Sequence, residues 1–99
     1  MKNKFLKDFL VKVNNFSEVS IKTGDTEINP YKKAIQEYIF HWDRADDTTK
    51  KEFTRIFLED KKLFKEHMKS HNSFLHVIEE EYDYLLAKVK RFKLDKMDD

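Results

Sequence analysis

Cysteine is absent from this 99-residue sequence, which also contains only one glycine and one proline. Without cysteine the chain can form no disulfide, thiolate metal site or thiol nucleophile, a composition that suits the reducing interior of a cell. A single glycine rules out the glycine-rich loops that hold phosphates and dinucleotides. No Ser, His and acidic set has the local context of a hydrolase motif. We therefore expect a cytoplasmic protein that is not an enzyme and uses no cofactor.

Long hydrophobic runs are also absent, since no stretch approaches the roughly 20 apolar residues needed to cross a bilayer. Residues 1–13 are interrupted by lysines and by Asp8, so they lack the apolar centre of a signal peptide. Charged residues make up 39% of the chain but sum to a formal charge of +1, which is not typical of a dedicated nucleic-acid binder. We expect neither secretion nor a membrane span, and recognition of any charged partner through a local cluster.

Aromatic residues, by contrast, are abundant: the chain has nine Phe, four Tyr and one Trp. Aromatic side chains bury more apolar area than aliphatic ones, so a compact core is feasible in a chain of this length. The composition predicts a single helical domain over residues 1–99. Its expected class is all-α, a small three- or four-helix bundle with a long heptad-patterned C-terminal helix or helix pair.

The first third of the chain divides where its only Gly and Pro, Gly24 and Pro30, fall close together. Residues 1–14 predict a basic amphipathic helix, of a kind that packs on a bundle or lies on an anionic membrane surface. Residues 15–29 are expected to form a loop or a small hairpin, and residues 30–95 the helical bundle.

Two helix starts can be recognised inside the bundle region. Asn29 followed by Pro30 predicts the start of a helix that runs to about Ala45. Thr49 and Glu52 have the spacing of a capping box, which predicts a third helix from about residue 49. The short connection between these helices favours an antiparallel pair.

The C-terminal half contains large side chains at alternate steps of four and three residues, the heptad repeat typical of coiled coils. This stripe consists of Phe64, Met68, His71, Leu75, Ile78, Tyr82, Leu85, Val89 and Phe92. A continuous helix over residues 61–94 would span roughly 50 Å at about 1.5 Å per residue and would need a partner. A break near Ser73 would instead let two helices fold back into a closed bundle. Both architectures remain open at this point.

The last helix is the predicted protein-binding surface. The residues proposed for it are Phe74, Leu75, Ile78, Glu81, Tyr82, Leu85, Lys88, Val89 and Phe92. Acidic residues at the e and g positions of the repeat, Glu79 and Glu81, precede basic ones, Lys88 and Lys93. Because e faces e and g faces g in an antiparallel pair, this order predicts an antiparallel homodimer. An ordinary helix in solvent explains the same order, since it suits the helix dipole.

The basic end of this helix supports an alternative, a nucleic-acid surface. Lys88, Lys90, Arg91 and Lys93 would contact phosphates while Phe92 stacks on a base. The phase of Phe92 with the apolar stripe is better explained by packing in the core.

The histidines supply only weak candidates for a metal site. His67 and His71 lie four residues apart on one helix face, and His76 with Glu80 repeats this spacing. A spacing match on one helix is unspecific, and surface histidines in a Lys- and Glu-rich chain explain it equally well. No metal site is therefore predicted.

The function indicated by these features is that of a small intracellular helical adaptor or inhibitor, which binds another protein or itself. Its size and helical character are similar to those of small phage- or plasmid-type regulators. The alternative is a nucleic-acid-associated accessory protein that uses the Lys-rich helix faces.

Overall fold

The computed structural model describes residues 3–23, 29–70 and 74–97, with the backbone alone described at 20–23 and 74–75. These residues form five α-helices and contain no β-strand. The helices are α1 (Lys4–Thr23), α2 (Pro30–Arg44), α3 (Asp47–Glu59), α4 (Lys61–Ser70) and α5 (Phe74–Lys96). The predicted all-helical class is confirmed, whereas the predicted number of helices, three or four, is too low.

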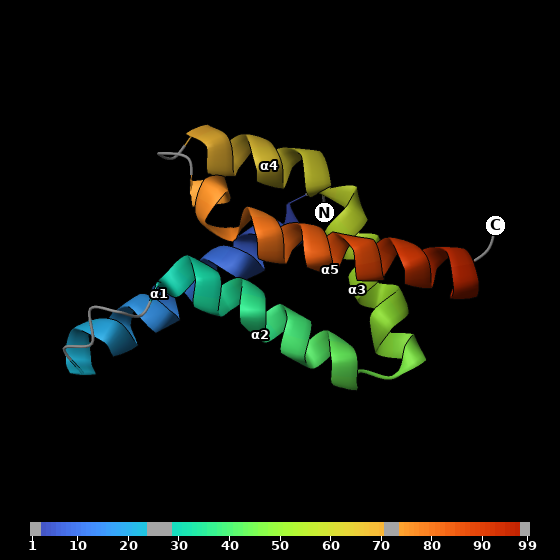
Figure 1. Cartoon of the computed structure of the whole chain (residues 1–99), viewed down its shortest axis with the longest axis horizontal. Helices are drawn as coiled ribbons and strands as arrows, with labels where there is room; N and C mark the ends of the chain where they lie inside the picture. Colours follow the sequence, from blue (N-terminus) through green and yellow to red (C-terminus); the bar gives the residue numbers. More distant parts are fainter. Residues whose placement is uncertain (1–2, 24–28, 71–73, 98–99) are drawn as a thin grey trace.

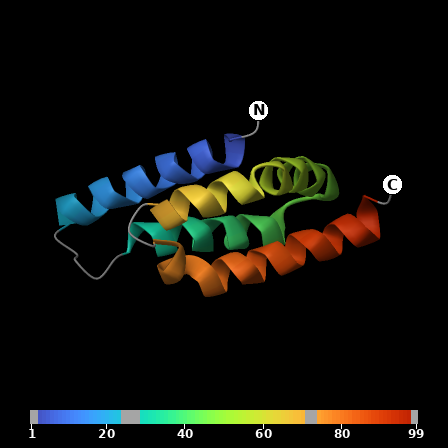
Figure 2. The same cartoon turned by 90° about the horizontal axis from the view of Figure 1, so that it is seen from above.

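The helices are arranged as two antiparallel pairs joined by α3. The helix α1 runs against α2, α4 runs against α5, and α3 crosses between the two pairs (Figure 1). Seen from above, α1 and α5 lie at opposite edges, with α2 and α4 between them (Figure 2). The described residues extend over 47 × 29 × 24 Å. None of the described helices is long and apolar enough to span a membrane.

The first helix is longer than the sequence predicts. The sequence favours a loop or hairpin over residues 15–29, but α1 continues as helix to Thr23. The apolar side of α1 extends past the predicted end, because Phe16 packs against the core one turn beyond the buried Val13. Val19 and Ile21 alternate with polar residues, a pattern compatible with a strand. The packing of Phe16 on the core favours a helix instead. Gly24 and the rest of residues 24–28, where a loop or hairpin was predicted, lie outside the described residues.

The second helix begins and ends as predicted. The Asn29 side chain accepts hydrogen bonds from the backbone N–H groups of Tyr31 at 3.0 Å and Lys32 at 3.2 Å. These two donors have no partner inside the helix, so the cap stabilises its first turn. The helix ends at Arg44, and Ala45 already has extended backbone angles.

The third helix begins two residues earlier than predicted, and its cap differs. The Asp46 side chain accepts from the Thr49 N–H at 2.8 Å, and this hydrogen bond holds the pKa of Asp46 below its usual value. Thr49 is therefore a donor inside the first turn, so the predicted capping box of Thr49 with Glu52 is wrong. Asp46 occupies the N-cap position three residues before Thr49, so the helix has already begun where the sequence predicted its cap.

Of the two architectures open for the C-terminal half, the broken one is found. Helix α4 ends at Ser70 and α5 runs back along it, so no single helix covers residues 61–94 (Figure 1). Residues 71–73, and with them the predicted core position of His71, lie outside the described residues. A second break falls at Asp60, between α3 and α4.

Aromatic rings form the centre of the core. Phe5 of α1 contacts Phe57 of α3 and Phe64 of α4 with ring centroids 4.8 and 5.1 Å away, and Tyr38 of α2 at 5.1 Å. Phe64 in turn stacks on Tyr82 of α5 at 5.2 Å. Since offset and edge-on ring pairs are favourable beyond their buried area, this cluster joins all five helices. It buries the apolar face that a membrane-bound α1 would need.

Candidate binding groove between α2, α3 and α5

The predicted protein-binding surface on α5 is largely inside the core. Ile78, Leu85 and Val89 have no exposed area and Tyr82 has 1%. These side chains pack against other helices of the same chain, so a seam between two copies would require the core to open. Phe92 is half-buried at the edge of the core. The side chains of Phe74 and Leu75 lie outside the described residues.

Two of the four charges predicted to pair between copies, Glu81 and Lys88, instead pair within the chain. Glu81 lies 3.4 Å from Lys32, and the Lys88 ammonium donates a hydrogen bond of 2.7 Å to Asp43. Both partners belong to α2, which packs along α5. The hydrogen bond to Asp43 is the main cause that raises the pKa of Lys88, so this lysine remains cationic.

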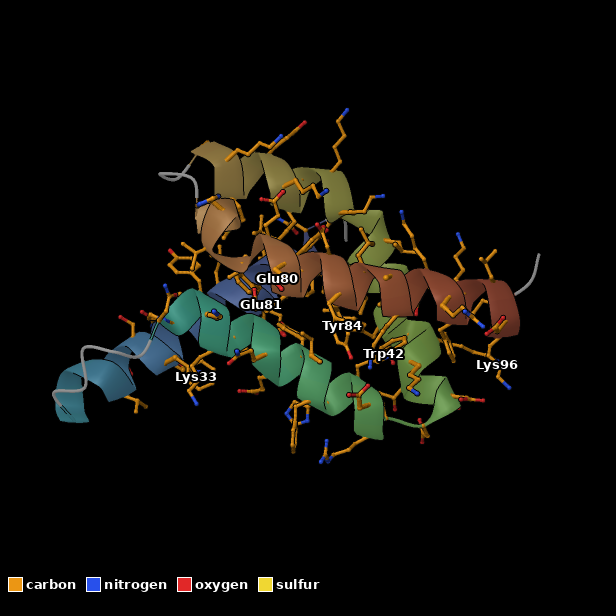
Figure 3. The ribbon with its side chains drawn as sticks, viewed as in Figure 1. Lys33, Trp42, Glu80, Glu81, Tyr84 and Lys96 are labelled. Carbon is orange, nitrogen blue, oxygen red and sulfur yellow. The ribbon has the colours of Figure 1, made fainter. Side chains whose placement is uncertain are left out.

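An open groove, which we call the α2–α5 groove, lies where the C-terminal ends of α2 and α5 meet the start of α3. Its volume is about 510 Å³. Its lining residues are Trp42, Lys50, Tyr84, Ala87, Lys88, Arg91, Phe92 and Asp95. Figure 3 shows Tyr84 and Trp42 between α5 and the C-terminal half of α2, with Lys96 beyond them near the end of α5.

Aromatic side chains from two helices form the apolar part of the groove. Trp42 of α2 meets Phe92 of α5 edge-on, with ring centroids 5.5 Å apart. Tyr84 is 52% exposed, an unusual position for a large ring in a chain whose other aromatics are mostly buried. Trp and Tyr are enriched among the residues that dominate binding energy at protein interfaces.

Lysine side chains lie over these rings. The Lys50 ammonium is 5.3 Å from the ring centre of Trp42 and 5.9 Å from that of Phe92, and Lys88 is 4.8 Å from that of Tyr84. Ammonium groups at such distances are attracted to the ring faces, which holds the long side chains in place. The groove therefore presents cations in defined positions above an apolar floor.

The cations of the groove differ in how they are neutralised. Lys88 pairs with Asp43, and Arg91 lies 3.5 Å from Asp95. Lys50 takes part in no ion pair within the part of the chain that the structure describes. It is therefore the cation of the groove lining that has no ion pair in the described residues.

A smaller cavity adjoins the groove between α2 and α3. It has a volume of about 70 Å³ and an almost wholly apolar wall. Its lining residues are Tyr38, His41, Trp42, Ala45, Thr49, Lys50 and Phe53. Because Trp42 and Lys50 line both spaces, the cavity and the α2–α5 groove share one wall.

The residues predicted for nucleic-acid binding fall on more than one side of α5. Lys88 and Arg91 line the groove, whereas Lys90 and Lys93 are exposed residues outside its lining. The structure therefore brings only half of this set together.

The weak metal candidates do not form a site in the described residues. His67 is half-buried on α4, while His76 and Glu80 are exposed on α5, and His71 is not described. Among residues 3–23, 29–70 and 74–97, no group of three or more histidine and acidic side chains is placed to hold a metal ion.

Sequence reasoning identified Lys88, Arg91 and Phe92 but not the role of Lys50 and Tyr84. Tyr84 carried a usable signal, because it is a large ring off the heptad stripe and therefore faces away from the core. Lys50 carried none, since its contact with Trp42 joins two different helices.

No protein-family model, curated protein or solved structure matches this chain.

Proposed function

We propose that this chain is a non-catalytic protein-binding module, an adaptor or inhibitor, that holds a partner protein in the α2–α5 groove. The observation that carries the proposal is the groove itself, where Trp42, Tyr84 and Phe92 line an open space beside fixed cations. Interfaces of modest size depend on a few aromatic and Arg anchors in such concave patches.

Self-association through the heptad stripe is a weaker use of the same helix. An antiparallel coiled-coil dimer would need Tyr82 and Leu85 on the surface, and both are in the core. Glu81 and Lys88 would also have to exchange their α2 partners for those of a second copy. The groove is therefore the proposed contact surface.

The alternative, a nucleic-acid-associated accessory protein, is favoured by the basic end of α5. Five Lys or Arg residues and a single acidic one fall within residues 88–96. Base stacking in the groove is opposed by the ammonium groups of Lys50 and Lys88, which already lie over the ring faces. Binding to a random oligonucleotide that weakens steeply with salt would favour this alternative.

The proposal can be tested by photo-crosslinking from the groove. A benzophenone amino acid replaces Tyr84 in the groove or, as a control, Leu63 on α4, which is also a large exposed apolar residue. After irradiation in an extract of the native source, we expect protein adducts from position 84 and not from position 63. Adducts that nuclease removes, or equal adducts from both positions, would contradict a protein-binding groove.

A further inference from the structure

We infer that the α2–α5 groove accepts an acidic segment of the partner protein, with an apolar side chain next to its carboxylates. This inference rests on the proposed function and specifies the chemistry of the partner. Three features of the groove carry it: the unpaired Lys50, the distribution of charge along α5, and the apolar cavity behind Trp42.

Lys50 supplies the principal electrostatic contact. Its ammonium is held over Trp42 and Phe92 without an ion pair in the described residues. A carboxylate that approaches from the groove completes a pair with a cation that is already in position. Preorganisation of this kind reduces the side-chain entropy lost on binding.

The charge gradient along α5 selects and orients an acidic segment. Glu79, Glu80, Glu81 and Asp83 lie in its first half, and the basic residues between 88 and 96 lie in its second half. Figure 3 shows Glu80 and Glu81 at one end of this axis and Lys96 at the other. An acidic segment is therefore repelled from the first half of α5 and attracted to the half that lines the groove.

Within the basic half, the acidic side chains that line or flank the groove are already neutralised. Asp43 accepts from Lys88, and Asp95 pairs with Arg91. Lys90, Lys93 and Lys96 form no ion pair with the rest of the described chain and are exposed on the same half of α5, outside the groove lining. These lysines therefore add an unneutralised positive charge to this half of α5, which attracts an acidic segment without contacting it in the groove.

The cavity between α2 and α3 accounts for the apolar part of the ligand. Its volume of about 70 Å³ is several times the roughly 10–15 Å³ that one water requires, so it has room for a small aliphatic side chain. Its wall is apolar, and transfer of an aliphatic group into it is favourable. Because Lys50 borders both spaces, the carboxylate and the aliphatic group would be near neighbours in the ligand.

A selection from random peptides tests this chemistry directly. A library of random 12-residue peptides displayed on phage is selected against the full chain and, separately, against Lys50→Glu. We expect peptides from the full chain to be enriched in Asp or Glu beside Leu, Ile or Val. We expect this enrichment to disappear with Lys50→Glu.

The enriched peptides are then synthesised and their dissociation constants measured by fluorescence anisotropy. Lys50→Glu should weaken binding at least tenfold, and Lys50→Gln, which keeps a similar stem without the charge, should weaken it by a smaller factor. The matched control is Lys62→Glu on α4, which makes the same charge change outside the groove lining and should alter binding less than twofold. Circular dichroism of each variant verifies that the helices remain folded.

Three results would overturn the inference. The first is that the selected peptides are enriched in neutral or basic residues. The second is that Lys50→Glu and Lys62→Glu weaken peptide binding equally. The third is that a single-stranded oligonucleotide binds, in a Lys50-dependent manner, more tightly than any selected peptide. Neutral or basic peptides together with protein adducts at position 84 would refute the acidic partner and leave the protein-binding groove intact. Failure to select any peptide, together with the absence of protein adducts, would refute both.

Discussion

Asp60, at the break between α3 and α4, is expected to hold the N-terminus of α1 in place. It is 1% exposed, and one of its carboxylate oxygens accepts a hydrogen bond of 2.8 Å from the backbone N–H of Leu6. Leu6 is in the first turn of α1, where N–H groups have no partner inside the helix. Asp60→Ala removes the acceptor and leaves this donor buried and unpaired. We expect the free energy of unfolding to fall by about 1–3 kcal/mol.

The negative charge of Asp60 destabilises the fold, whereas the hydrogen bond that it accepts from Leu6 stabilises it. Burial raises the pKa of Asp60 above its ordinary value of 3.8, and the hydrogen bond from Leu6 offsets only part of this effect. The other oxygen and the nearby Tyr82 hydroxyl, both buried, have no hydrogen-bond partner among the described residues. The proton of the Asp60 carboxyl group is therefore bound more tightly in the folded state than in the unfolded state. The contribution of Asp60 to stability is therefore greatest at pH values below its ordinary pKa. This contribution falls as the pH rises through the raised pKa of the folded state.

Asp60→Asn separates the two effects, because an amide keeps the acceptor and removes the charge. We expect it to be at least as stable as the parent at pH 7, with the advantage diminishing towards pH 4. The assay is urea unfolding followed by circular dichroism at both pH values, with Glu66→Gln on the exposed face of α4 as a control. The reasoning is refuted if Asp60→Ala stays within about 0.5 kcal/mol of the parent, a range typical of surface changes. It is also refuted if Asp60→Asn is as damaging as Asp60→Ala.

Three further outcomes follow from the core, the caps and the buried stripe. Phe5→Ala should lower the free energy of unfolding by about 3–5 kcal/mol in urea titrations, because the Phe5 ring contacts three other helices. The control is Phe40→Ala, since the Phe40 ring is 52% exposed, and an equal loss from this variant would contradict the prediction. Asn29→Ala should cost about 1 kcal/mol and lower the melting temperature, whereas Asn29→Ser should recover most of the loss. Light scattering at low and high salt should give the 12.1 kDa mass of one chain, since Leu85 is in the core; a dimer that dissociates with salt would support the coiled-coil seam instead.

The features that the sequence predicted correctly depend on local signals. Asn29 and Pro30 define the start of α2 through the chemistry of a few adjacent residues. The heptad spacing placed Ile78 and Leu85 on one apolar helix face, which is buried in the structure, because helical periodicity alone determines which side chains share a face. Such periodicity cannot tell whether the face meets a second copy or another helix of the same chain.

The boundaries predicted incorrectly depend on contacts between distant residues. The alternation around Val19 is compatible with a strand, and packing of Phe16 on the core favours helix instead. No Gly or Pro marks the break at Asp60 in the sequence. The Asp60 carboxylate accepts a hydrogen bond from the backbone N–H of Leu6, which lies 54 residues away in the chain. A single sequence contains no local record of such a contact.

The sequence by itself thus determined that this chain is helical, which residues form its apolar stripes, and that positive charge gathers near its C-terminus. Only the tertiary structure brought Trp42, Lys50 and Phe92 together from three helices to form a groove. The physical reason is that helix formation and amphipathicity depend on neighbours three or four residues apart. A binding surface depends on how whole helices pack, and that is decided by the shape of the complete core.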